Sequence, residues 1–264
     1  MIAAVRSYLA VARQLVRIGI IRKSQFRVEF FCQVLMDVLW YLSQILVFEI
    51  LFLHTQTIAG WTVADVRVFL GFVFVSDGFM MVWLGQAWHF GRELKDGKLD
   101  PVRVRPISPI FLYFFQRFSL EGSANMLIAL GYLAYAIAMG PGFTVESSGM
   151  LVWGVGIACW SRVVLTVFFS TWEFYVLNSD LSAFTHEITM AGADRPLDIF
   201  DRRVREFLLF ALPVGAMTHF PASMVLGRYG VPASVAYTAW MALFGWAVFA
   251  FWRRGFRRYE SALG

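Results

Sequence analysis

The stretch VFLGFVFVSDGFMMVWLGQAWHF, residues 68–90, decides the fold of this chain. It holds 23 residues, of which Asp77 is the only Asp, Glu, Lys or Arg. A helix rises about 1.5 Å per residue, so about 20 apolar residues cross the roughly 30 Å hydrocarbon core of a bilayer. Residues 68–90 therefore predict a transmembrane helix with Asp77 inside it.

Other apolar windows of the same kind occur along the chain. They cover residues 30–53, part of 107–139, 149–177 and 231–252, with a shorter one at 204–220. The composition agrees, because 59% of the 264 residues are hydrophobic and 16% are charged, whereas about 25% are charged in an average soluble domain. We expect an all-α polytopic membrane protein with six transmembrane helices, forming a single transmembrane domain over residues 1–264.

The basic residues cluster at alternate ends of these windows. Six precede the first window, and further clusters lie at 92–105, 195–205 and 253–258, so that nineteen of 23 share one side. The connections 54–65 and 140–148 hold no Lys or Arg. Because cytoplasmic loops are enriched in these residues, we predict that both termini and a second loop, 178–203, face the cytoplasm.

Two segments are expected to lie at the membrane surface. Residues 1–27 repeat apolar side chains at helical spacing while Arg6, Arg13 and Arg17 share another face, which indicates an amphipathic cytoplasmic helix against membrane lipids or an ordinary basic flank. Residues 221–230 hold a proline and two glycines among apolar residues. Irregular backbone at membrane depth needs protein or water to satisfy its polar groups, so we expect a re-entrant outer hairpin, with a simple outer loop as the alternative.

Charged side chains also fall inside the predicted spans, where an unpaired charge costs several kcal/mol. They are Asp37, Asp77, Glu121, Arg162 and Glu173. If the third span begins near residue 107 and the fourth near 149, Glu121 and Arg162 reach similar depths and can pair. Such a pair would either fix helix register or line a polar path, and the sequence leaves both roles open.

The connection after residue 90, RELKDGKLDPVRVRP at 92–106, has too much local structure for a linker. Gly97 is a natural helix terminator, and Asp100 before Pro101 is typical of a new helix start. Pro106 then marks the entry to the next span. We predict one short helix lying across the membrane surface.

These residues resemble a known family, the permease subunits of type-2 ATP-binding-cassette (ABC-2) exporters, in particular a bacterial branch of similar length. The first matching pattern is Gly-x-Leu-Asp followed by Arg-Pro, met here as Gly97, Leu99, Asp100, Arg105 and Pro106. The second is RPLDIF at 195–200, then Pro213, FPA at 220–222 and LG at 226–227. Arg195 departs from the branch, which usually has Tyr at that position.

The resemblance implies a division of labour between subunits. This chain would form the membrane path in a bacterial inner membrane and pair with a second permease copy or a related permease. Two separate ABC ATPase subunits would bind ATP and Mg, so no cofactor is expected in this chain, which has no Gly-x-x-x-x-Gly-Lys-Ser/Thr loop. In the family the 91–106 connection docks into the ATPase. Carried over, the coupling residues are Lys95, Gly97, Lys98, Leu99, Asp100, Arg105 and Pro106, and the direction of transport is export.

Two other functions stay open at this stage. An ion-gradient-driven secondary transporter would use Asp37, Asp77 or Glu121 as a proton or cation site, and a membrane scaffold would transport nothing. The four histidines lack metal-ligand spacing, so we expect neither a metal site nor catalysis by this chain. The short, separated basic clusters do not predict a nucleic-acid partner.

Overall fold

The computed structural model describes residues 27–140, 145–176 and 192–259, together with 11, 13, 14, 16–19 and 21. These residues form helices and connecting turns and include no strand. Among these described residues, five helices are long and apolar enough to cross a membrane. They are α2 (Arg27–Leu53), a span that begins as α3 (Val63–Phe79) and ends at Lys95, α7 (Leu120–Ala138), α8 (Val145–Trp172) and α12 (Val231–Arg258).

Shorter elements complete the chain. After α3 the same span continues through a π-helical turn, η1 (Met80–Leu84), a 3₁₀ turn, η2 (Gly85–His89), and α4 (Phe90–Lys95). The connection to α7 holds α5 (Asp100–Arg103) and α6 (Pro109–Phe114). The segment before α12 holds η3 (Leu197–Ile199), α10 (Arg202–Glu206), the π turn η4 (Phe207–Ala211), η5 (Val214–Ala216) and α11 (His219–Val225).

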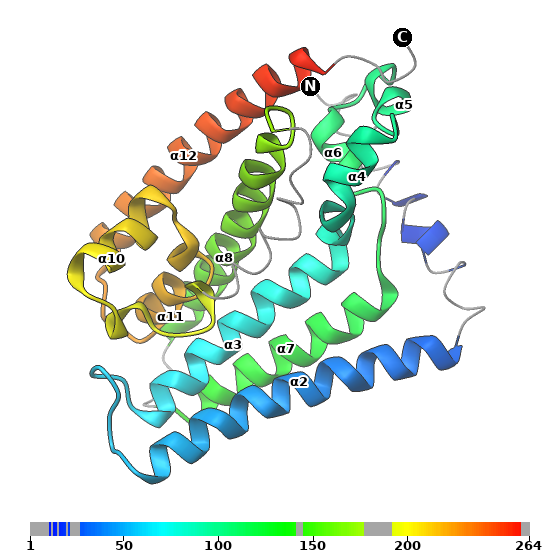
Figure 1. Cartoon of the computed structure of the whole chain (residues 1–264). Helices are drawn as coiled ribbons and strands as arrows, with labels where there is room; N and C mark the ends of the chain where they lie inside the picture. Colours follow the sequence, from blue (N-terminus) through cyan, green and yellow to red (C-terminus); the bar gives the residue numbers. More distant parts are fainter. Residues whose placement is uncertain are drawn as a thin grey trace.

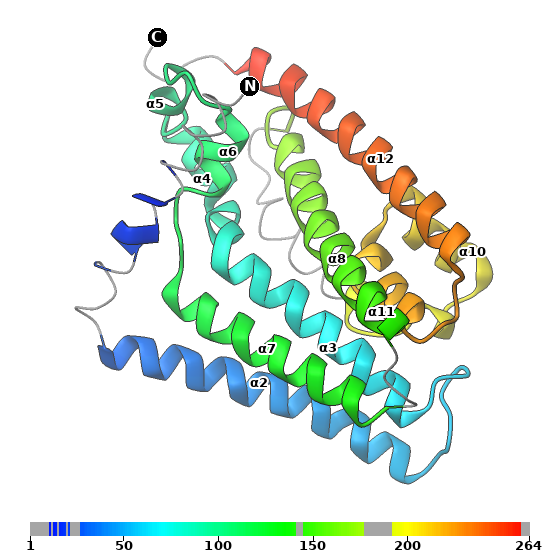
Figure 2. The same ribbon diagram turned by 180° about the vertical axis from the view of Figure 1, so that it is seen from behind.

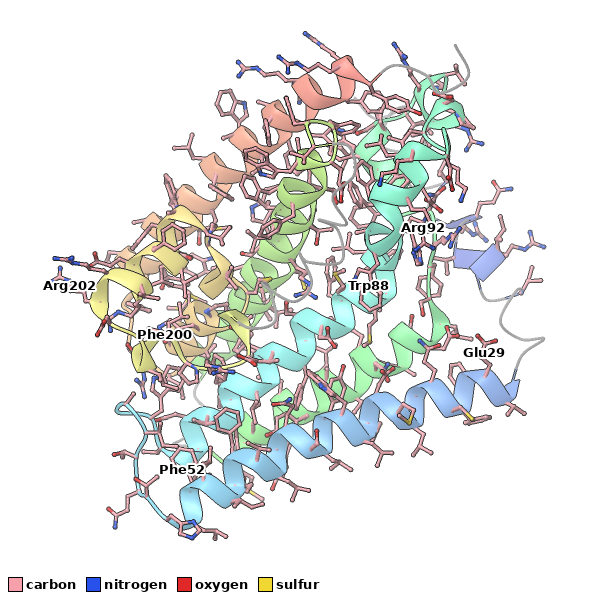
Figure 3. All side chains as sticks on the ribbon, viewed as in Figure 1. Glu29, Phe52, Trp88, Arg92, Phe200 and Arg202 are labelled. Atoms are coloured by element: carbon pink, nitrogen blue, oxygen red, sulfur yellow. The ribbon has the colours of Figure 1, made fainter. Side chains whose placement is uncertain are left out.

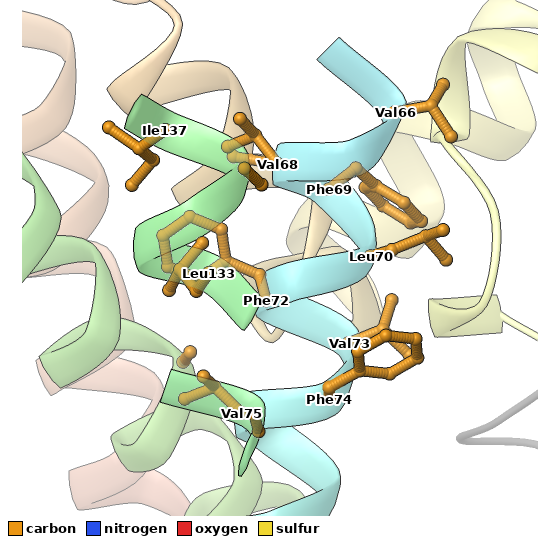
Figure 4. Packing of buried hydrophobic residues seen from close by; sticks show 14 of the residues in the cluster. Val66, Val68, Phe69, Leu70, Phe72, Val73, Phe74, Val75, Leu133 and Ile137 are labelled. Atoms are coloured by element: carbon orange, nitrogen blue, oxygen red, sulfur yellow. The ribbon is translucent and has the colours of Figure 1, made fainter. Parts of the chain in front are cut away.

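α3 is the central helix of the bundle. Figure 1 shows α2 and α7 along one side of it and α8 with α12 on the other. The packing against α7 is close because Gly71 has no side chain: a Cβ there would lie 2.6 Å from Leu133. Figure 4 shows Leu133 and Ile137 of α7 beside the apolar side chains of α3. Small residues allow this kind of backbone approach between transmembrane helices.

α2 differs from α3 because many of its apolar side chains point away from the rest of the chain, although Tyr41, Ile45 and Phe48 pack in or against the core. Those that are largely exposed include Phe31, Leu35, Leu42, Leu46 and Leu53. In a soluble protein such a helix would be unstable in water, but in a bilayer these side chains face hydrocarbon. The expectation of a multi-pass, all-helical membrane protein is confirmed for the described residues.

The bundle has two ends. The basic end holds residues 92–106 and 253–258, and Arg103 there reaches the Tyr259 carbonyl. The hairpin end holds residues 54–62 and 194–230, and Arg228 there donates to the Gly60 carbonyl at 2.9 Å. Figure 3 shows Phe52, Phe200 and Arg202 at the hairpin end, with Glu29 and Arg92 at the opposite end.

This arrangement corrects the prediction that the basic cluster at 195–205 lies at the same end of the bundle as the cluster at 92–105. Arg195, Arg202, Arg203 and Arg205 are matched by an equal number of neighbouring carboxylates, at 194, 198, 201 and 206. Three of these arginines form local ion pairs, so counting basic residues overstated the preference of this cluster for the cytoplasm. Residues 178–191 of the predicted 178–203 loop lie outside the described residues.

The helices differ from two of the predicted windows. The span predicted within 107–139 is α7, which begins only at Leu120, with Ser119 as its N-cap, after α6 has ended at Phe114. In 204–220 the helix ends before Pro213, so the part of the chain that the structure describes has five long candidate spans where we predicted six.

The structure describes one of the two predicted surface segments fully and the other only in part. Residues 221–225 lie in α11, and the chain then turns at Gly227 with φ +72° before α12, with the side chains of 219–224 buried. Most of the predicted amphipathic segment, 1–27, lies outside the described residues, although 11, 13, 14, 16–19 and 21 are helical.

Candidate functional site

The connection between α4 and α6 folds into a tight loop at the basic end, which we call the 96–106 loop. α4 stops because Gly97 adopts φ +69°, a conformation that costs glycine little. Its N–H donates to the Leu94 carbonyl at 3.3 Å and that of Lys98 to the Glu93 carbonyl at 3.0 Å, which closes the helix end. α5 then begins at Asp100 with Pro101 in its first turn. The helix stop and start predicted from the sequence are both present.

Glu93 fixes this loop to the bundle. Its side chain is buried, and its carboxylate accepts a hydrogen bond from the Tyr113 hydroxyl at 2.8 Å and another from the Gln86 amide. Lys98 and Arg117 lie 3.7 and 3.8 Å from the same carboxylate. One side chain therefore joins η2, α4, α6 and the 96–106 loop.

The loop has a buried side and an exposed side. Leu99 belongs to the apolar cluster formed with the end of α12, and Val102 and Gly97 are also buried. Val104, in contrast, is 83% exposed, next to the exposed Arg105. Of the predicted coupling residues, Lys95, Lys98, Arg105 and Pro106 are exposed, Asp100 is partly buried, and Gly97 and Leu99 are buried.

Arg162 is buried in the middle of the bundle, and its acidic partner is Asp77. The Arg162 Nη2 lies 3.7 Å from the Asp77 Oδ1, and both side chains are shielded from solvent. The remaining donors face sulfur: Nε donates to the Met80 Sδ at 3.2 Å and Nη1 to the Met217 Sδ at 3.8 Å. Arg162 thus joins α8 to α3, to η1 and to the segment before α11.

The predicted pairing of Arg162 with Glu121 is wrong. The two residues reach similar depths only if one helix runs from residue 107, whereas the helix breaks and Glu121 lies in the first turn of α7. There its carboxylate accepts a hydrogen bond from the Ser119 hydroxyl at 3.0 Å. A carboxylate at a helix N-terminus is favoured by the helix dipole, and this position contributes to stabilising Glu121.

The break before α7 lies directly against the π turn η1. The Ser119 N–H donates to the Val82 carbonyl at 3.1 Å. This hydrogen bond gives a partner to a carbonyl that the π turn would leave without one. A Cβ at Gly122 would lie 2.6 Å from the Val82 nitrogen, so only glycine permits this approach. Irregular backbone inside a membrane requires such partners.

The other two predicted intramembrane groups lie at separate places. Asp37 of α2 accepts a hydrogen bond from the amide of Asn125, which is fully buried in α7. Glu173, just past the end of α8, is 1% exposed and packs against Gly91 of α4. The charges predicted inside the spans therefore make several different local contacts, and their assignment to helix register or to a polar path stays a prediction.

The hairpin end carries a polar network that the sequence did not reveal. Asp198 accepts hydrogen bonds from Trp61 Nε1 at 2.8 Å and from Arg205 at 2.7 Å. Arg228 lies 4.0 Å above the Trp61 ring and donates to Asp65 at 3.1 Å. Burial alone would raise the pKa of Asp198, but the bond from Trp61, together with His219 and Arg205, lowers it overall.

His219 completes this network from α11. Its Nδ1 accepts a hydrogen bond from the Leu197 N–H at 3.2 Å, which places the ring proton on Nε2, 4.0 Å from Asp198. The ring is 1% exposed. Burial lowers the pKa of His219 to about 4, although the negative charge of Asp198 acts in the opposite direction and raises it.

Sequence reasoning located the 96–106 loop but missed Glu93. A signal was available, because Gln86 and Glu93 lie seven residues apart and therefore on one face of a helix. Asp198 and Trp61 are 137 residues apart, and no local pattern links them.

Comparison with known proteins gives one match. The family model described as "ABC-2 family transporter protein" matches residues 38–262, most of the chain. No curated protein and no solved structure matches it.

Proposed function

This chain belongs to the ABC-2 family of transporter proteins, and on that premise we propose that it is the permease subunit of an ATP-driven exporter. Permeases of this family normally work with an ABC ATPase, which carries the ATPase activity. The observation that carries the proposal is the 96–106 loop, which presents Val104 and Arg105 outward while Glu93 holds it to the membrane helices.

The contacts of the loop explain how movement of a docked ATPase would reach the membrane. Glu93 links the loop to α4 and α6, and Arg103 donates to the Tyr259 carbonyl beyond α12 at 3.5 Å. A displacement of the loop by the ATPase is then transmitted to both the second and the last span. Since packed helices shift as units between discrete arrangements, ATP binding in the partner would change the population of two permease conformations.

We place the basic end, with both chain termini, in the cytoplasm of a bacterial inner membrane. Support comes from the basic clusters at 92–105 and 253–258, which lie together at that end. The hairpin end, with 54–62 and 194–230, then faces outward. The cytoplasmic position of the 96–106 loop is what docking to an ATPase requires.

The complete transporter in this proposal contains two permeases and two ATPase subunits, and the ATPases hold ATP and Mg. The exposed apolar face of α2 is available to lipid or to a second permease. The buried Asp77–Arg162 pair at 3.7 Å joins elements that would have to move relative to one another.

Gentle purification of the full chain from its native membrane tests the proposal. A nucleotide-binding subunit recovered in stoichiometric amount, and lost when Val104 is replaced by Glu, is the expected result. Val204→Glu, the same change at an exposed valine of α10 at the hairpin end, is the control and should leave recovery of the subunit unchanged. Recovery of the chain without any ATP-binding protein would instead favour transport driven by an ion gradient, or a scaffold role.

A further inference from the structure

A groove of about 630 Å³ opens at the basic end between α6, α8 and α12. Figure 2 shows the ends of these three helices approaching one another at that end of the bundle. Its volume lies within the range of about 300–1,000 Å³ typical of ligand sites. No residue in the proposed coupling contacts of Glu93 lines it.

The lining of the groove changes character along its length. Trp160 and Val163 of α8 and Phe249 of α12 form an apolar floor. Arg253 and Arg257 line the same groove toward the end of α12. They are four residues apart and therefore project from the same face of the helix.

The charged side chains that line the groove are all positive. Among its lining residues in the described part of the chain there are two arginines and no carboxylate. Phe249 lies one helical turn before Arg253. When the two arginines lie at the level of the lipid phosphates, the apolar floor of the groove therefore lies deeper, among the hydrocarbon chains. A ligand that matches this pattern is amphiphilic, with an anionic head and an apolar tail.

We propose that this groove binds one anionic glycerophospholipid from the cytoplasmic leaflet. Its phosphate lies between Arg253 and Arg257, and an acyl chain lies along Trp160, Val163 and Phe249. The headgroup then sits beside Ser108, at the start of α6, and bridges α6 to α12. The choice of the cytoplasmic leaflet rests on the orientation proposed above, whereas the site itself does not depend on coupling to an ATPase.

The test uses the purified full chain in nanodiscs of phosphatidylcholine with increasing phosphatidylglycerol, and bound lipid is counted by native mass spectrometry. Two basic residues near an anionic headgroup contribute about fivefold each to affinity. Arg253→Gln with Arg257→Gln should therefore weaken phosphatidylglycerol binding about 30-fold. The matched control, Arg254→Gln with Arg258→Gln, removes the same charge from residues that do not line the groove and should change binding less than about threefold.

A second variant tests the acyl chain. Val163→Trp narrows the apolar floor but keeps both arginines, and should also weaken phosphatidylglycerol binding by about tenfold or more. Equal losses in the groove and control variants would overturn the proposal, because they would indicate a diffuse surface-charge effect. Full competition by soluble glycerol 3-phosphate would overturn it as well, since the site would then recognise a free phosphate without a lipid tail.

Discussion

Glu93 and Arg162 are both buried and charged, yet they are stabilised in different ways. Glu93 accepts two hydrogen bonds and has two basic side chains near it. Arg162 has one carboxylate at 3.7 Å and two sulfur acceptors. Removing a partner from a buried charge costs more than the pair itself contributes, because the remaining charge stays buried. The two residues therefore make distinct predictions.

Replacing Glu93 with Leu should destabilise the protein by about 3 kcal/mol, because the Tyr113 hydroxyl and the Gln86 amide lose their buried acceptor. Thermal unfolding in detergent measures the loss. Hydrogen exchange in residues 96–106 should become faster at the same time. Asp96→Asn, at an exposed neighbouring position, is the control and should unfold like the parent; equal behaviour of the two variants would contradict the role assigned to Glu93.

Replacing Arg162 with Met should destabilise the bundle by about 3–5 kcal/mol, since Asp77 is left as a buried charge without a basic partner. The double variant with Asp77→Leu should recover most of that loss, because no charge then remains in the apolar interior. Unfolding midpoints of the parent, both single variants and the double variant give the coupling energy. Additive losses would mean that the two side chains do not stabilise each other.

His219 predicts a specific pH dependence. Its pKa of about 4 in the folded protein lies below the ordinary value of 6.5, so between these values the unfolded chain binds more protons. Stability should therefore fall as the pH drops from about 7 to about 4, by about 3 kcal/mol. In His219→Asn the amide oxygen can still accept from the Leu197 N–H, and the His219 part of this pH dependence should disappear. An unchanged profile would show that another group is responsible.

At the scale of elements, the helix breaks are the features that sequence patterns resolved least well. The apolar run from 107 to 139 hides the start of α7 at Leu120, although Ser119 is an ordinary N-cap whose hydroxyl accepts from the Gly122 N–H at 2.9 Å. Hydropathy measures composition and does not detect which backbone groups find partners. The π turns η1 and η4 are likewise determined by their packing neighbours, which the linear sequence does not list.

Gly122 gives the element-scale prediction. A methyl group there would lie 2.6 Å from the η1 backbone, so Gly122→Ala should push α7 away from η1 and cost about 1–3 kcal/mol. Gly131 on the same helix has open space at its Cβ position, and Gly131→Ala should instead be neutral or stabilise by up to about 1 kcal/mol. Unfolding in detergent distinguishes them, and equal tolerance at both positions would refute the close approach.

At the scale of the whole molecule, the sequence predicted the class of protein and the 96–106 loop but misplaced one segment. The helix stop at Gly97 and the restart at Asp100 depend on local backbone preferences, and local reasoning found them. The position of 195–205 depends on contacts such as Trp61 with Asp198, which no local pattern encodes. Arginines paired with neighbouring carboxylates resemble a cytoplasmic cluster when only basic residues are counted.

In the proposed orientation the two ends of the bundle face different partners. Val104 is the most exposed apolar side chain of the 96–106 loop, and Arg203 lies in α10 at the hairpin end. A photo-reactive amino acid at either position reports which protein lies within contact distance in intact membranes.

That cross-linking measurement tests the central claim most directly. The account predicts that a probe at position 104 captures an ATP-binding subunit and that a probe at position 203 does not. Capture of the ATPase from position 203, or of no ATP-binding protein from position 104, would contradict both the proposed orientation and the role of the loop as the docking site.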